Sequence, residues 1–401
     1  MISYEEARSV ILAACPPLEP RAVPLAEALG CVASVDVDAD EAVPPFANTA
    51  MDGYAVRAAD TAGAPVQLKV VGTLAAGAAP DRDVGAGEAI RIMTGAPVPP
   101  GADAIVMVEY THSDDGGTTV VVEREARAGD HVRPAGDDIA AGDVVIAAGT
   151  ELGPGHLGVL ASLGFQRVPV YPRARVGVLT TGDEVVDGPQ PLQPGQIRDS
   201  NRPMVLALVA QSGFDAIDLG QARDDPDVIE AAITGAVARC DAVVTTGGVS
   251  VGDFDHVKAV LARLGRLESW QVAIKPAKPL AFSVVEGTPV FGLPGNPVSA
   301  MVSFELFARP AVRQMTGHRQ LFRPQITALA DNALRRRPDG KVHFMRAVAA
   351  AGDDGRIHVR PAGPQGSHQL HATAGANALA VVPDGDGVAA GGDVDVLLLG
   401  L

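Results

Sequence analysis

The feature that most constrains this chain is a regular alternation, between residues 173 and 316, of short apolar runs with helical segments. The helical segments follow Ser200, Asp225, Asp253 and Asn296, where a capping side chain or a following proline favours a helix start. The apolar runs are predicted strands at Val176 to Thr180, Ala216 to Leu219, Ala242 to Thr246 and Val290 to Gly292. Strands separated by helices at this spacing pair in parallel, so we predict a doubly wound, mainly parallel α/β domain.

The segments on either side follow other patterns, and the full length of 401 residues allows two to three domains. From 43 to 140, short β-type runs between Gly, Pro and Asp clusters predict a β-rich inserted domain. From 317 to 401, similar runs predict a small C-terminal β-domain. Residues 1–42 and 141–172 hold helical pieces, at 3–14, 24–29 and 155–164, which we expect to pack together as a discontinuous linker domain. The expected fold class is therefore an α/β multidomain protein.

Charge and cysteine content exclude several classes of protein. The 32 Lys and Arg against 48 Asp and Glu give a net charge of −16, which disfavours nucleic acid or an anionic membrane as a partner. The three cysteines are widely spaced and form no C-x-x-C pair, so neither a disulfide framework nor a cysteine-rich zinc site is expected. With no apolar run long enough to span a membrane and no signal-like start, we expect a cytoplasmic protein.

Three glycine-rich turns follow the predicted parallel strands, at the edge of the sheet where such domains bind ligands. Their backbone N–H groups, near helix N-termini, would suit a phosphate or another oxyanion. The alternative is that the glycines only meet the conformational needs of each turn. No P-loop or dinucleotide-binding motif is present. The candidate residues in these turns are Thr181, Gly182, Gly247, Gly248, Ser250, Gly252, Pro294, Gly295, Asn296 and Ser299.

Acidic residues in or beside these turns, namely Glu184, Asp224, Asp253 and Asp255, would repel an anion unless Mg²⁺ bridged carboxylate and phosphate oxygens. The alternative is that Asp253 is a helix cap and Asp224 a solvated turn residue.

The sequence has only five lysines, and two of them, Lys275 and Lys278, lie in one proline-flanked segment. Proline stiffens the backbone, so this segment is predicted to act as a rigid anion clamp. His368 and His371 have a zinc-like spacing but no evident third ligand, so no zinc site is predicted.

These motifs, together with residues 44–56 and 91–97, resemble the MoeA-type molybdopterin molybdenumtransferases, whose relatives include the E domain of gephyrin. The resemblance covers essentially the whole chain. It implies an enzyme of molybdenum cofactor biosynthesis that inserts molybdenum from molybdate into adenylylated molybdopterin, with Mg²⁺-dependent release of AMP. Ala277 departs from the pattern, because glycine is usual between the two lysines of this block.

The resemblance also implies roles for particular residues. Glu184, Asp224 and Asp255 would form the metal and pterin-nucleotide side, and Thr94 would contribute to substrate binding. Lys275, Lys278, Ser299, Arg346 and Ser367 would hold molybdate. Asp52 and Asp138 would reach the crevice of the other subunit of a homodimer, and transient contact with a molybdopterin adenylyltransferase is implied as well.

Two other functions remain open at this point. A molybdopterin adenylyltransferase shares the doubly wound domain and the G-G-x-S-x-G turn, but has no use for residues 1–172 and 317–401. A non-catalytic scaffold like the gephyrin E domain would tolerate loss of site charges, whereas the acids and both lysines are present here. The site residues suit molybdate and tungstate alike.

Overall fold

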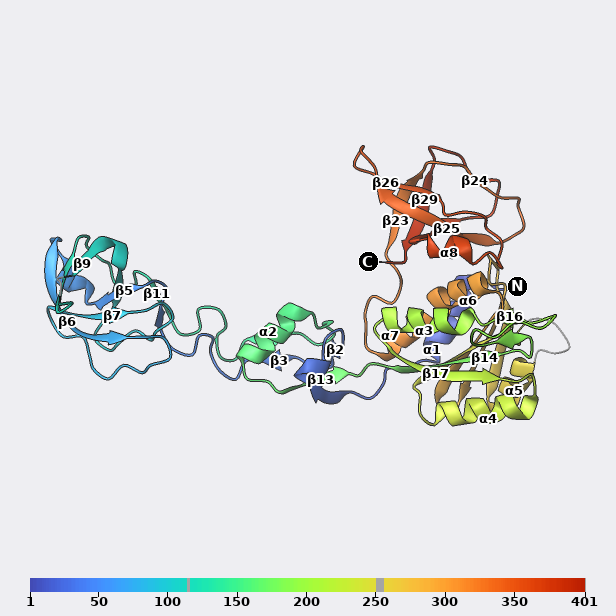
Figure 1. Ribbon diagram of the computed structural model, residues 1–401, viewed down its shortest axis with the longest axis horizontal. Helices are drawn as coiled ribbons and strands as arrows, with labels where there is room; N and C mark the ends of the chain where they lie inside the picture. Colours follow the sequence, from blue (N-terminus) through green and yellow to red (C-terminus); the bar gives the residue numbers. More distant parts are fainter. Residues whose placement is uncertain (114–115, 250–255, 401) are drawn as a thin grey trace.

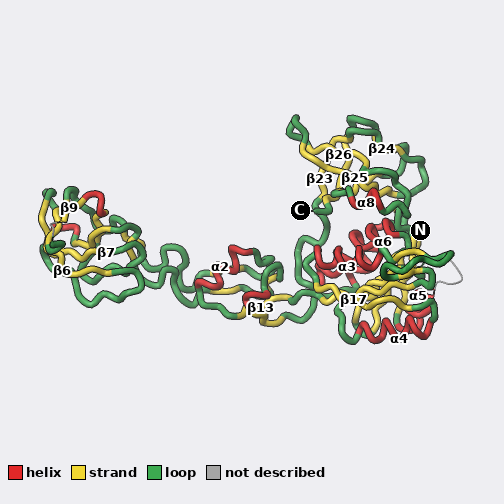
Figure 2. Tube along the Cα trace, viewed as in Figure 1, coloured by secondary structure: helices red, strands yellow, loops and turns green. Residues whose placement is uncertain are grey.

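The structure is a computed structural model that describes residues 1–113, 116–249 and 256–400. The molecule is elongated: the chain runs from the α/β domain through a narrow linker to a β-rich domain at the far end, and then returns (Figure 1). Most of the helical residues gather in the α/β domain, whereas the far end is mainly strand and loop (Figure 2). Within the described ranges no helix has the length and apolar character needed to cross a membrane.

The α/β domain contains a six-stranded sheet in the order β17-β14-β18-β22-β21-β19. The first four strands are mutually parallel, and β21 and β19 add antiparallel pairings at one edge, which confirms a mainly parallel sheet. Val176 and Val178 pack into the core on one face and Leu179 into the core on the other, as period-two alternation requires. The strands are β14 (Arg175–Thr181), β17 (Asp215–Ala222), β18 (Ala242–Thr246), β19 (Arg266–Gln271), β21 (Pro279–Val285) and β22 (Thr288–Leu293).

Helices cover both faces of this sheet (Figure 1). Asp225 caps its helix as predicted, because its carboxylate accepts the backbone N–H groups of Asp227 and Val228. Ser200 makes no such side-chain bond; Asp199 instead accepts the backbone N–H of Arg202. The helices are α3 (Asn201–Gln211), α4 (Pro226–Val237), α5 (His256–Leu264), α6 (Pro297–Ser303) and α7 (Arg309–Met315), with a π-helical turn η4 (Phe304–Ala308) between the last two.

The first helix, α1 (Tyr4–Ala13), does not pack where we expected it. It lies against η4 and α7 of the α/β domain, and Ala7 and Ile11 are fully buried in that core. The physical reason is that its apolar stripe is complementary to the apolar surface of α7, whereas the linker domain has a separate small core. The helix therefore belongs to the α/β domain and not to the linker.

The linker domain consists of two small sheets and α2 (Pro154–Ser162), a helix that the sequence predicts. The helix expected over 24–29 is only a short 3-10 turn, η1 (Leu25–Glu27), that contacts α2. The strands are β1 (Arg21–Pro24), β2 (Val32–Ala33) and β13 (Arg167–Tyr171) in one sheet, and β3 (Val37–Asp38) with β12 (Val144–Ile146) in another.

The inserted domain is β-rich, as predicted, and is built on a six-stranded sheet in the order β8-β5-β7-β6-β10-β9. A two-stranded ribbon joins β4 and β11 beside it. The elements are β4 (Asn48–Thr49), β5 (Gly53–Val56), η2 (Ala58–Thr61), β6 (Val66–Leu74), β7 (Glu88–Ile92), β8 (Ala104–Met107), η3 (Val108–Tyr110), β9 (Thr111–Ser113), β10 (Thr119–Val122) and β11 (Val132–Arg133).

The C-terminal domain is a closed barrel, since β25 pairs with both β26 and β27 and so completes a ring of five strands. A short strand from the α/β domain, β20 (Ile274–Lys275), pairs with β25 and ties the two domains together. The barrel elements are β23 (Gln325–Ala330), β25 (Val342–Ala351), β26 (Ile357–Pro361), β27 (Ala378–Val382) and β29 (Asp393–Leu398), with the ribbon β24 (Leu334–Arg335) and β28 (Gly387–Val388) and the short helix α8 (His371–Ala374).

Candidate functional site

A cavity of about 560 Å³ lies at the seam between the α/β domain and the barrel. Its wall combines the segment around β20, the turn after β22 and the loop that follows β26. Segments far apart in the sequence thus meet at one place, and most of the predicted oxyanion side is among them. The predicted residues that line the cavity are Lys275, Lys278, Pro294, Gly295, Asn296, Ser299 and Ser367.

The two lysines are held by backbone contacts on both sides of the domain boundary. Lys275 pairs through β20 with His343 of the barrel, and the carbonyl of Lys278 accepts the N–H of Val272 at 2.7 Å. Between them Ala277 is buried and has a φ of 76°, a conformation that favours glycine. Both ammonium groups are exposed, and neither forms an ion pair with any residue that the structure describes. The segment therefore presents two free cations on a constrained backbone.

The turn after β22 connects the cavity to the barrel and to the glycine-rich turns of the sheet. The side-chain amide of Asn296 donates to the hydroxyl of Ser367 at 3.2 Å, so the α6 N-terminus is bonded to the barrel loop. Asn201 donates to the carbonyl of Gly295 at 2.7 Å. A Cβ on Gly295 would lie 3.7 Å from the Cα of Gly247, which shows how closely this turn approaches the one after β18.

Arg346 does not line the cavity, contrary to the role that the resemblance implied. Its side chain is 1% exposed, and its guanidinium donates to the carbonyls of Gln369, Pro364 and Gly366 at 2.6, 2.8 and 3.1 Å. Burial lowers the pKa of this guanidinium. Because its donors are used by the loop that carries Ser367, Arg346 shapes the cavity wall from behind.

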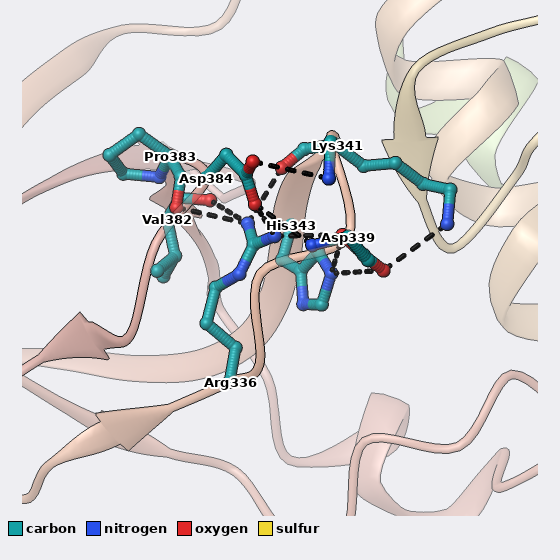
Figure 3. Close-up of polar contacts among 8 residues, drawn as sticks. Arg336, Asp339, Lys341, His343, Val382, Pro383 and Asp384 are labelled. Carbon is teal, nitrogen blue, oxygen red and sulfur yellow. Dashed lines mark hydrogen bonds and ion pairs between the residues drawn. The ribbon is translucent and has the colours of Figure 1, made fainter.

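The predicted site did not include three polar residues that line the cavity, Lys341, Gln365 and His368. Gln365 holds the loop, since its amide donates to the carbonyls of Arg346 and Gly363. Lys341 bonds to Asp339 at 3.2 Å, in a polar cluster of the barrel (Figure 3). The scarcity of lysine was a signal for Lys341, but nothing in the sequence distinguished Gln365 from a surface glutamine.

A second group of predicted residues lies where β14, β17 and β18 end. The Glu184 side chain folds back over its own turn, and its carboxylate would lie only 2.6 Å from a Cβ placed on Gly182. A Cβ on Gly247 would lie 2.8 Å from the carbonyl of Thr181, so glycine is required there by close approach. Asp224 accepts the backbone N–H of Asp183 at 3.2 Å, which ties the turns after β14 and β17 together. Gly248 follows in the same turn as Gly247, with a φ of 65°.

The predicted metal site is only partly within the described residues, since Asp255 lies outside them, as do Asp253, Ser250 and Gly252. Among the residues the structure does describe, no three His, Cys, Asp or Glu side chains are grouped as a metal site. Glu184 and Asp224 supply carboxylate oxygens, the donors that Mg²⁺ prefers, and Mg²⁺ typically uses one or two protein carboxylates with substrate phosphates. The residues present therefore fit a substrate-bridged Mg²⁺.

Asp52, Thr94 and Asp138 lie away from both groups. Asp52 and Thr94 are in the inserted domain at the far end of the molecule (Figure 1). Asp52 accepts both the backbone N–H and the hydroxyl of Thr94, each at 2.7 Å, and these bonds lower the pKa of Asp52. Asp138 is an exposed acid whose N–H donates to the carbonyl of Val43. Within one chain these residues do not join the cavity.

Comparison with known proteins agrees with this architecture along the whole chain. Family models described as the MoeA N-terminal region (domain I and II), the probable molybdopterin binding domain and the MoeA C-terminal region (domain IV) match residues 2–164, 177–314 and 331–399. Molybdopterin molybdenumtransferase of Haemophilus influenzae is 38% identical over 98% of this chain and 97% of its own length. Molybdopterin molybdenumtransferase 2 of Mycobacterium tuberculosis is 40% identical over 96% of each chain.

The solved structures give the same result for the fold. A crystal structure of the molybdopterin biosynthesis MoeA protein from Pyrococcus horikoshii superposes with a TM-score of 0.83 at 31% identity, covering 100% of this chain and 99% of that one. The sequence identity, the three matched regions and the superposed fold together show that the chain belongs to the MoeA family of molybdopterin molybdenumtransferases.

Proposed function

We propose that this chain is a transferase of molybdenum cofactor biosynthesis that inserts molybdenum from molybdate into adenylylated molybdopterin, with Mg²⁺-dependent release of AMP. The observation that carries the proposal is the cavity between the α/β domain and the barrel. It lies beside the glycine-rich end of a doubly wound sheet, where such folds bind their ligands.

The charge of the cavity wall suits a small oxyanion. Lys275, Lys278 and Lys341 line it, and no carboxylate does so within the described part of the chain. The chain as a whole carries −16, so this local cluster must overcome a general repulsion of anions. The hydroxyls of Ser299 and Ser367 add neutral hydrogen-bonding groups that can donate to molybdate oxygens.

The ends of β14, β17 and β18 suit the nucleotide side of the substrate. Gly182, Gly247 and Gly248 have positive φ, a conformation found in turns whose successive backbone N–H groups form anion-binding concavities. Glu184 and Asp224 would hold Mg²⁺, joined by Asp255 if the resemblance holds. When bound, Mg²⁺ neutralises charge on the phosphoanhydride whose cleavage by water releases AMP. Gly295 lies close to Gly247, so the nucleotide side adjoins the cavity lined by Lys275 and Lys278.

The test is to measure AMP release from adenylylated molybdopterin against molybdate concentration. Lys278→Ala should raise the molybdate concentration needed for half-maximal rate, because a charge-assisted contact of about 1.5–3 kcal/mol is lost. Glu184→Gln should instead slow AMP release at saturating molybdate. If molybdate has no effect on AMP release by the wild-type protein, the proposal is wrong. If the protein makes adenylylated molybdopterin from ATP, it is an adenylyltransferase.

We further propose that the site is completed by a second copy of the chain. Asp52 and Thr94 belong to the inserted domain, which lies far from the cavity of its own chain (Figure 1), and Asp138 does not line that cavity either. The family resemblance assigns all three to the site. A symmetric dimer could bring the inserted domain of one chain to the cavity of the other.

Mixed dimers test this arrangement directly. Asp52→Ala and Lys278→Ala proteins are mixed, unfolded and refolded together, and activity is measured at a molybdate concentration too low for the Lys278→Ala protein to be active. If sites are shared, one site of each heterodimer contains both native residues, and activity reappears. If Asp52 and Lys278 acted in the same chain, every site would carry a substitution and activity would stay low. A monomer that retains full activity would also refute the shared site.

A further inference from the structure

A second cavity, of about 540 Å³, lies beside the first on the barrel side. The two share Lys275 and Pro276 from one wall and Gln365 and Gly366 from the other. The new part of the wall comes from the segment that follows β24, where three arginines, Arg335, Arg336 and Arg337, are consecutive. We refer to this second cavity as the arginine cavity.

The middle arginine is a structural anchor. The side chain of Arg336 is fully buried, and its guanidinium bonds to Asp339 at 2.7 Å and Asp384 at 2.6 Å (Figure 3). It also donates to the carbonyls of Lys341 and Pro383 at 2.6 and 2.9 Å. These bonds fix the backbone of the arginine segment against the barrel.

The acid on the cavity wall is neutralised by the same cluster. Asp339 accepts from Arg336, and its other bonds are to Lys341 and to Nε2 of His343, each at 3.2 Å (Figure 3). A carboxylate surrounded by these donors has little capacity left to pair with another cation. Burial lowers the pKa of His343, whose Nε2 is bonded to Asp339.

The flanking arginines are available to a ligand. Arg335 and Arg337 both line the arginine cavity, and both are exposed. In the part of the chain that the structure describes, neither of them nor Lys275 has an ion-pair partner. Three cationic residues without an ion-pair partner in the described structure therefore line one cavity, in a chain of strongly negative charge.

The size and chemistry of this wall select a class of ligand. Guanidinium groups match pairs of phosphate oxygens in a fork geometry. A free tetrahedral oxyanion, equal in size to a few water molecules of about 30 Å³ each, would leave most of the cavity empty. Pro276 and Met345 give the wall an apolar part that an organic body can cover.

We propose that the arginine cavity binds the phosphate monoester group of an organic ligand, through Arg335, Arg337 and Lys275. Because Lys275 lines both cavities, a ligand there lies next to whatever the first cavity holds. If the proposed function is right, release of AMP leaves a phosphate monoester on the pterin product, and this cavity would retain that phosphate. The identity of the natural ligand rests on the proposed function, but phosphomonoester binding does not.

The experiment is titration calorimetry at low salt with phenyl phosphate, a phosphate monoester with an apolar body. Inorganic phosphate and molybdate are titrated separately. We expect the wild-type protein to bind phenyl phosphate more tightly than inorganic phosphate. The double variant Arg335→Gln/Arg337→Gln should weaken phenyl phosphate binding by at least about tenfold and leave molybdate binding unchanged. The variant Arg21→Gln/Arg360→Gln, which removes the same charge from two other exposed sites, should bind phenyl phosphate like the wild type.

Three outcomes would overturn the proposal. These are no saturable binding of phenyl phosphate, equal weakening by the arginine and control variants, or equal weakening of molybdate and phenyl phosphate by the arginine variant. An unchanged thermal unfolding midpoint shows that the arginine variant is folded. Since the readout is binding, a failure of AMP release would refute the proposed function and leave this result intact.

Discussion

The buried position of Arg346 leads to a prediction that separates a structural role from direct contact with substrate. We consider Arg346→Met, which keeps the length of the side chain and removes all of its donors. Three carbonyl oxygens, of Pro364, Gly366 and Gln369, then lose a charged donor. The loop that carries Ser367 should loosen, and with it the wall of the cavity lined by Lys275 and Lys278.

The magnitude follows from these bonds. A hydrogen bond to a charged group contributes about 1.5–3 kcal/mol, so three give an upper limit of about 4.5–9 kcal/mol. Pro364 is exposed, so water can replace some of the lost bonds, and methionine avoids the cost of burying a charge. We therefore expect a net loss of about 2–4 kcal/mol.

Thermal unfolding measures this loss. For a domain the size of the barrel, 1 kcal/mol corresponds to about 4–8 °C, so the midpoint of barrel unfolding should fall by about 8 °C or more. Lys278→Met is the matched control, because its exposed ammonium makes no ion pair in the described structure and its loss should barely change the midpoint. If Arg346→Met unfolds at the wild-type temperature and only molybdate dependence changes, then Arg346 is a ligand and our reasoning is wrong.

Three other predictions concern the metal, the backbone and pH. Excess chelator should abolish AMP release while circular dichroism stays unchanged; unchanged turnover of dialysed enzyme would reduce Glu184 and Asp224 to solvated turn residues. Ala277→Gly should raise the free energy of unfolding in urea by about 0.5–1 kcal/mol, because the native φ of 76° strains alanine; a loss of stability would show that packing of its buried methyl dominates. Burial, with a contribution from Arg313, lowers the pKa of His318 from 6.5 to about 4, so the unfolded state binds a proton in that interval and stability should fall as pH drops from about 6.5 to 4. The urea midpoint of His318→Gln should change less over this range, and parallel pH profiles would contradict the assignment.

The parts of the fold that follow local rules were predictable from the sequence. The strands of the α/β domain are apolar runs bounded by polar turns, and Asp225 caps its helix through bonds made within three residues. The lysine segment was predictable because two prolines and two lysines are unusual in so short a stretch. The carboxyl-end rule for parallel sheets also predicts that the glycine-rich turns lie together.

The features that could not be predicted depend on contacts between distant segments. Nothing local to α1 indicates that Ile11 is buried against α7 instead of the linker. Arg346 carries the same charge whether it faces a ligand or a loop, and only the position of the three carbonyls decides which. The sequence indicates Asn296 as a helix cap. It gives no sign that the Asn296 side chain bonds to Ser367 across the domain boundary.

The docking of α1 on α7 also determines the order in which the chain can fold during synthesis. The ribosome releases α1 well before its partner α7, which follows only after the linker domain, the inserted domain and all six strands of the α/β sheet. The inserted domain has cores of its own and can fold as soon as it emerges, because domains generally fold as units. The α/β core is therefore closed late, by a helix that was synthesised long before α7, and Ala7 and Ile11 lack their native partners until then. During that interval the nascent chain presents the apolar stripe of α1, and exposed apolar surface of this kind is what chaperones bind.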